Sequence, residues 1–199
     1  MEKSEIVEQT KLAFDFIQRL YLETSYFIKE IEGILKQEEE DFQILRPAGY
    51  AISTARSVGL ESGSVEQWLT RKGVVFFAAK SDTEIKKGQT ITKFAPNMKL
   101  IVIRFVLCDR DSNEPEVWAG VVSDIINKKD YSKFEYYVWK FAYYDRKLFQ
   151  NPGESTYEDN DFAIKLNLLK KLLYSISSTK DIQREIITPV LTMYQGNYI

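Results

Sequence analysis

The sequence predicts an α+β protein in which an antiparallel sheet of four to five strands is covered on one side by helices. Three observations predict this class: a long proline-free start with helical periodicity, β-branched and aromatic runs in the middle, and helical spacing again towards the end. The composition, 44% hydrophobic and 28% charged, is that of an ordinary globular protein. We therefore predict a single domain over residues 1–199, with a long helix at 4–37, a sheet region at 46–130 and a helix-rich part at 131–199.

Residues 4–37 are predicted to form one amphipathic helix, because they contain no proline and a single glycine, Gly33. Apolar and small residues recur at the alternating spacings of a heptad seam, namely Ile6, Thr10, Ala13, Ile17, Leu20, Thr24, Phe27, Ile31 and Ile34. Beside the seam lie Val7, Phe14, Tyr21, Ile28 and Leu35. A helix of about 50 Å exceeds what a compact domain of this size needs. Its seam either packs along the sheet and the C-terminal helices or self-associates, with Ile17, Leu20, Phe27 and Ile31 as candidate interface residues.

The sheet region contains four strand-like segments. Residues 50–57 are small and polar, 74–79 form a buried apolar run, and 98–108 and 117–126 are the longest candidates. The turn-rich stretch 109–115 separates the last two, which predicts a β-hairpin at the centre of the sheet. Between the first two strands, Ser64 and Glu66-Gln67 form a capping-box pattern that predicts a short helix.

The last third of the chain is predicted to be mostly helical. A capping-box pattern at Ser132 and Glu135 opens a helix that ends near Pro152. Residues 157–161 are expected to form a polar loop, whereas the segment 161–176 fits both a strand and a helix. A final helix is expected from about residue 180, with Ile182, Ile186, Val190 and Tyr194 on one face and a bend at Pro189.

The composition excludes several classes of function. The chain has no histidine, which removes Ser-His and Cys-His catalysis and most zinc chemistry, and Cys108 is its only cysteine. The net charge of -2 provides no basic field for nucleic acid, so we do not expect nucleic acid as a partner. A single cysteine, no signal-peptide pattern and no apolar run of about 20 residues favour a cytoplasmic protein without a membrane partner.

One stretch has the residue types of an anion site. Residues 56–64 join a strand to a helix start, where free backbone N–H groups, hydroxyls and an arginine suit phosphate or carboxylate groups. The spacing matches neither the phosphate-loop nor the dinucleotide fingerprint. A flexible loop with an ordinary serine cap is the alternative interpretation. The candidate ligand-binding residues are Arg56, Ser57, Gly59, Ser62, Gly63 and Ser64.

Two acidic patterns resemble metal sites without completing them. Asp82, Glu84 and Lys86 are spaced as in magnesium-dependent nucleases, in which carboxylates hold the metal and a lysine assists the attacking water. They lie in a polar connection, however, so a surface turn is the simpler interpretation. The turn after Cys108 begins like a calcium loop, but Glu114 stands where glycine is required. We predict no metal or other cofactor, with magnesium only under the nuclease alternative.

The predicted helix after Tyr131 carries a second aromatic stripe, formed by Tyr136, Trp139 and Tyr143. A helix with two apolar stripes needs two surfaces to pack against, and the sheet can provide only one of them. The long first helix could cover this stripe within the chain, or the stripe could contact another protein, or it could stack on nucleic-acid bases.

Arg104 interrupts the apolar run of its strand, and a buried charge requires a partner. A salt bridge across the hairpin to Asp124 is the simplest prediction, with a lined pocket beside Val102 and Val106 as the alternative. Cys108 is expected to be a small packed residue, because no histidine can activate it.

These observations favour a non-catalytic interaction or regulatory module that self-associates or binds a protein partner, with a small anionic ligand near Arg56 as a further expectation. A magnesium-dependent nuclease or phosphoryl-transfer enzyme is the first alternative. Nucleic-acid binding without catalysis is the second.

Overall fold

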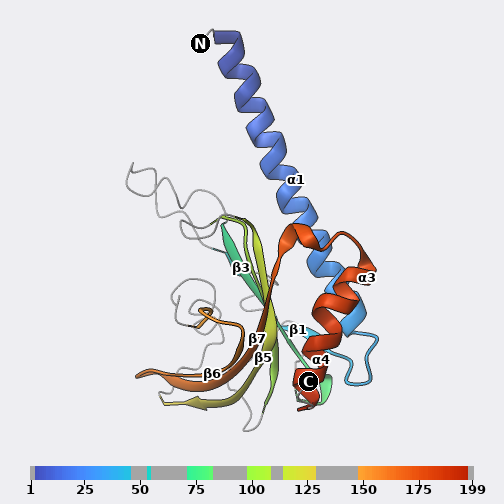
Figure 1. The fold of residues 1–199 in the computed structure, drawn as a ribbon, viewed down its shortest axis with the longest axis vertical. Helices are drawn as coiled ribbons and strands as arrows, with labels where there is room; N and C mark the ends of the chain where they lie inside the picture. The colour runs from blue at the N-terminus through green and yellow to red at the C-terminus, as the bar shows by residue number, and fades with distance from the viewer. Residues whose placement is uncertain are drawn as a thin grey trace.

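The computed structural model describes residues 3–45, 53–54, 71–82, 98–108, 114–128 and 148–196. It has the predicted α+β fold, with a long N-terminal helix, an open antiparallel sheet and a C-terminal helical segment (Figure 1). The helices are α1 (Lys3–Leu35), α3 (Thr179–Ile182) and α4 (Thr188–Gln195), with a π-helical turn at Gln183–Ile187 between the last two. The strands are β1 (Gln43–Leu45), β2 (Ser53–Thr54), β3 (Lys72–Ala78), β4 (Leu100–Val106), β5 (Glu116–Asn127), β6 (Gly153–Glu158) and β7 (Phe162–Leu172).

The sheet has the strand order β1-β3-β4-β5-β7-β6, and β2 also pairs with β3. The predicted hairpin of β4 and β5 is confirmed and lies at the centre of this order, with Arg104 opposite Trp118. The predicted strand number was too low, because β1 and β6 were missed. β1 has only three residues, and β6 is polar and almost wholly exposed, so neither carries an apolar alternation that a sequence pattern could detect.

The undecided segment at 161–176 is mainly strand β7, and residues 157–158, predicted as loop, belong to β6. The side chains of Phe162, Ile164, Leu166 and Leu168 are buried on one face of the sheet. Leu169 faces the other way and packs partly against the helical side. Because both faces of β7 meet apolar surface, its leucines follow one another in a way that also fits a helix.

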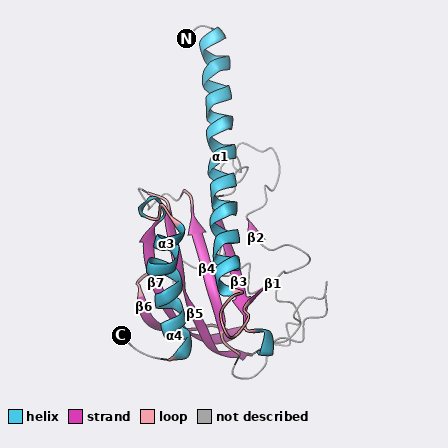
Figure 2. Ribbon diagram, turned by 90° about the vertical axis from the view of Figure 1, so that its right-hand side faces the viewer, coloured by secondary structure: helices cyan, strands magenta, loops and turns pink. Residues whose placement is uncertain are grey.

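Two apolar clusters lie on opposite faces of the sheet. One contains Phe76, Trp118 and Phe162 and includes Leu148 and Phe149, which precede β6. The other lies between the sheet and the helices, and Figure 2 shows α1 and the C-terminal helical segment side by side over that face. The prediction that the first helix covers one side of the sheet is therefore confirmed for its C-terminal part.

The C-terminal helical segment runs along the sheet as predicted from its apolar face. Ile182, Ile186 and Val190 are buried. Pro189 is the second residue of α4 and lies inside one continuous helical run, where a proline cannot donate the usual backbone hydrogen bond. The π-helical turn at Gln183–Ile187 lies directly before α4.

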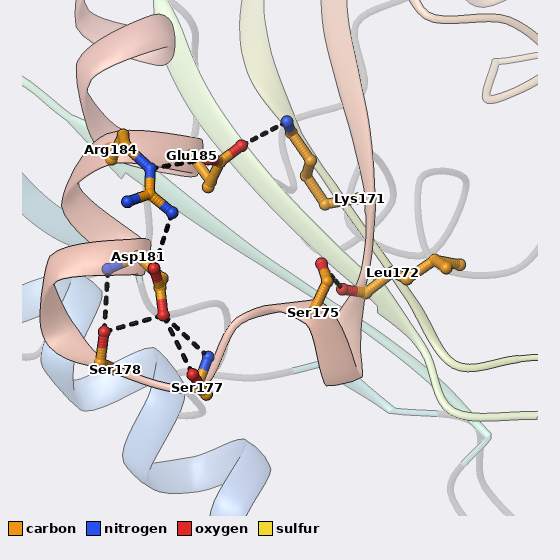
Figure 3. A network of polar contacts seen from close by, with 8 residues as sticks. All are labelled: Lys171, Leu172, Ser175, Ser177, Ser178, Asp181, Arg184 and Glu185. Atoms are coloured by element: carbon orange, nitrogen blue, oxygen red, sulfur yellow. Dashed lines mark hydrogen bonds and ion pairs between the residues drawn. The ribbon is translucent and has the colours of Figure 1, made fainter.

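A chain of polar contacts fixes this segment to the sheet (Figure 3). Lys171 of β7 forms an ion pair with Glu185 at 2.6 Å, and Arg184 bridges Glu185 and Asp181 at 2.8 Å to each. Asp181 also accepts a hydrogen bond from the hydroxyl of Ser178, the N-cap residue, at 2.8 Å. The hydroxyl of Ser178 is the main cause that lowers the pKa of Asp181, and Lys171 is the main cause that lowers the pKa of Glu185.

These carboxylates should make the fold acid-sensitive. Their folded-state pKa values lie below the ordinary values of 3.8 and 4.5, so the unfolded chain binds more protons as the pH falls. The stability that they contribute is present above the ordinary values and is lost as the pH falls through the lower folded-state values. We expect the free energy of unfolding of Asp181→Asn to fall less steeply than that of the wild type between about pH 5 and about pH 2 in urea titrations. Parallel pH profiles of the two proteins would contradict this assignment.

Candidate functional site

The N-terminal half of α1 projects beyond the body of the protein (Figure 1). Within the described residues, seven of the ten exposed large hydrophobic side chains lie on α1. They are Ile6, Val7, Leu12, Phe14, Phe16, Leu22 and Tyr26. An apolar concentration of this kind on an extended element marks a surface that another molecule can cover.

The projecting half has the residues to remain helical without support from the body. It contains neither proline nor glycine before Gly33, and Lys11, Asp15 and Arg19 stand four residues apart. Opposite charges at this spacing stabilise an exposed helix by roughly 0.2 to 0.5 kcal/mol per pair. The C-terminal half of α1 provides further stabilisation. Its packed turns are already helical, so the projecting turns extend an existing helix and do not have to nucleate a new one.

The exposed apolar face is a continuation of the face that anchors α1 to the body. We call Thr24, Ile28, Ile31 and Leu35 the anchored stripe, because all four are buried and the last three belong to the cluster between the sheet and the helices. Shifting these positions by two heptads towards the N-terminus gives Thr10, Phe14, Ile17 and Tyr21, on nearly the same side of the helix. We call Ile6, Val7, Thr10, Ala13, Phe14 and Ile17 the free stripe.

Two threonines at equivalent heptad positions show that the two stripes are built alike. The Thr24 hydroxyl donates to the carbonyl of Leu20 at 2.8 Å, and the Thr10 hydroxyl donates to the carbonyl of Ile6 at 2.7 Å. Thr24 is 6% exposed, so this internal hydrogen bond allows a threonine to be buried in the stripe without an unsatisfied hydroxyl. Thr10 already makes the same bond while its position is exposed, so burying it would leave no hydroxyl without a partner.

The predicted interface residues on α1 divide between the two halves. Ile31 is fully buried in the core, which corrects its assignment to an interface. Leu20 and Phe27 are half-buried and pack against the helical cluster, whereas Ile17 lies at the border of the projecting half. Tyr136, Trp139 and Tyr143 lie outside the described residues, so their predicted role stays a prediction.

The candidates missed from the sequence lie nearer the N-terminus or off the seam. Ile6, Val7 and Phe14 belong to the predicted seam and its flank, but nothing in the pattern distinguished them from the residues that are buried. Leu12 and Phe16 lie off the seam, and their only signal is that they are apolar residues on an otherwise charged side.

The predicted anion-binding residues 56–64 lie outside the described part of the chain, as do Glu84 and Lys86 of the nuclease pattern. Asp82 lies in a 3-10 turn (Lys80–Asp82), exposed, and its carboxylate accepts a hydrogen bond from the Tyr194 hydroxyl at 3.4 Å. Burial, followed by the charge of Asp82, raises the pKa of Tyr194 to about 12. Among the residues that the structure describes, no three acidic or thiol side chains are grouped so that they could hold a metal ion.

Arg104 is buried on the sheet face opposite the helices, and its guanidinium lies over the ring of Phe149, 4.3 Å from the centroid. The predicted salt bridge to Asp124 is wrong. Arg104 is opposite Trp118 in the register, and Asp124 lies six residues further along β5, about 20 Å away. Cys108 is exposed, which corrects its prediction as a packed residue.

Comparison of the chain with protein-family models, with curated proteins and with solved structures finds no match. No helix in the described ranges combines the length and the apolar character that crossing a membrane requires. The projecting half of α1 is therefore the candidate site that rests on observed geometry.

Proposed function

We propose that this protein is a non-catalytic interaction module that self-associates through the free stripe of α1. The observation that carries the proposal is the concentration of exposed apolar side chains on a helix that projects from the body. Burying one such side chain contributes about 1.5 to 3 kcal/mol, so a partner that covers several of them gains substantial free energy.

The charges of the projecting half support a protein partner. The ionisable side chains of residues 3–22 are Lys3, Glu5, Glu8, Lys11, Asp15 and Arg19, three of each sign. Helices that lie on anionic membranes are instead rich in lysine and arginine on their polar face. A zero net charge also removes the electrostatic repulsion that would oppose pairing of two identical segments.

The other parts of the proposal come from the sequence. The composition supports a cytoplasmic location, and a small anionic ligand at residues 56–64 is an additional proposal. Both are separate from self-association and can fail without affecting it.

Replacing Phe14 tests the proposed interface. Phe14 is 61% exposed, so Phe14→Asp should leave the body folded while it places a charge in the free stripe. Each copy of a dimer loses about 1.5 kcal/mol or more, so the dissociation constant should rise by at least about 100-fold. Light scattering over a concentration series should show a wild-type mass that rises towards twice the monomer mass and a variant that remains monomeric.

Leu12→Asp is the matched control, because Leu12 is 61% exposed, like Phe14, but lies on the opposite side of α1 from the free stripe. It should associate like the wild type. A wild-type protein that remains monomeric at high concentration would refute the proposal. Equal loss of association in both variants would show that the free stripe is not the contact.

A further inference from the structure

We infer that two copies of this chain pair antiparallel through their free stripes, with the two bodies at opposite ends of a short two-helix contact. The inference rests on the proposed self-association and adds its geometry and register. Two features carry it: the position along α1 at which the helix meets the body, and the apolar side chains that the free stripe can bury against a second copy.

The body excludes a parallel arrangement. The free and anchored stripes lie on nearly the same side of one helix, and from about Leu20 onwards that side is occupied by the sheet and the C-terminal helices. In a parallel pair, the partner helix would continue from the free stripe straight into this body. In an antiparallel pair, the partner helix ends where the body begins, and its own body lies beyond the N-terminus of the first copy.

The same border sets the register. Ile17 is the last residue of the free stripe before the body, so the longest overlap without a clash places Ile6 of one copy level with Ile17 of the other. Thr10 then faces Ala13 of the second copy, and these small side chains let the helices approach closely at the two-fold axis. Val7 and Phe14 of opposite copies meet beside them. Such an interface is isologous, so it closes at two copies.

The size of the contact predicts a reversible dimer. Each large apolar side chain of the stripe can bury roughly 60 to 120 Å². Ile6, Val7, Phe14 and Ile17, with Phe16 on the flank, therefore bury roughly 300 to 600 Å² per copy. The total of roughly 600 to 1,200 Å² is at or below the low end of stable interfaces, so association should depend strongly on concentration.

Disulfide cross-linking distinguishes the two arrangements. Cys108 is exposed and is first replaced by serine, and cysteines are then introduced into the full chain. Ile6→Cys with Ile17→Cys should give a covalent dimer as the main oxidised product on a non-reducing gel. Ile6→Cys alone should not, because two copies of residue 6 are 11 residues apart in height, about 16 Å, and a disulfide needs Cα atoms within about 7 Å. The same distance prevents an internal 6–17 bond.

Val7→Cys with Phe14→Cys provides a second pair at positions that are more than 60% exposed, where substitution cannot disturb the core. It should also cross-link. Efficient cross-linking of Ile6→Cys alone would show a parallel pair. A protein that is dimeric in light scattering but is cross-linked in neither double variant would have a different register. Either result would overturn the inference and leave the proposed self-association intact. A chain that is monomeric in light scattering would instead refute the proposed function itself.

Discussion

Gly120→Ala should destabilise the protein by at least about 3 kcal/mol, a large part of the stability of a domain of this size. Gly120 lies in β5 between Val102 of β4 and Leu168 of β7. A β-carbon built at this position would lie 2.9 Å from the Cα of Leu168, and it would overlap the carbonyl oxygen of Asn167. Both obstacles are backbone of the neighbouring strand, so the sheet itself would have to shift. Urea unfolding followed by circular dichroism measures the loss.

Gly33→Ala is the control for this prediction. Gly33 is exposed in the last turns of α1, and nothing lies within 4 Å of the position that a β-carbon would occupy. The same chemical change should therefore stabilise the protein by up to about 1 kcal/mol, because alanine has the higher helix propensity. A Gly120→Ala protein as stable as the wild type would show that β5 and β7 are further apart than this sheet places them.

Much of the fold could be predicted from local patterns, because most elements bury a regular face. The proline-free periodicity of α1, the β-branched runs of β3 to β5 and the spacing of Ile182, Ile186 and Val190 each reflect packing against the sheet. β6 could not be predicted in this way. Its residues are exposed, and its strand conformation follows from the backbone hydrogen bonds with β7, which no local pattern records.

The candidate site shows the same division. The stripe along α1 could be predicted, but the position at which it leaves the body could not, because that position depends on the length of the sheet beneath it. Arg104 shows a related difficulty. The sequence indicates that its buried charge needs a partner, but it does not identify that partner. The identity depends on the register of β4 with β5 and on the ring of Phe149, which precedes β6.

Ile31→Ala and Ile6→Ala separate the two functions that one stripe performs. Both isoleucines belong to the predicted heptad seam, but Ile31 is 0% exposed and Ile6 is 45% exposed. Ile31→Ala leaves a cavity between α1 and the sheet, so we expect a loss of about 2 to 5 kcal/mol of unfolding free energy. Ile6→Ala should leave the stability of the monomer within about 0.5 kcal/mol of the wild type.

Association should respond in the opposite way. Ile6→Ala removes apolar area from the free stripe and should weaken dimerisation about tenfold or more, since both copies lose the side chain. Ile31→Ala should leave the dimerisation of the folded protein unchanged at temperatures well below its lowered unfolding transition. Urea unfolding at low protein concentration measures the stability of the monomer, and light scattering over a concentration series measures dimerisation. If Ile6→Ala instead lowered the stability of the monomer as Ile31→Ala does, the free stripe would be covered within the chain, and α1 would have no surface left for a second copy.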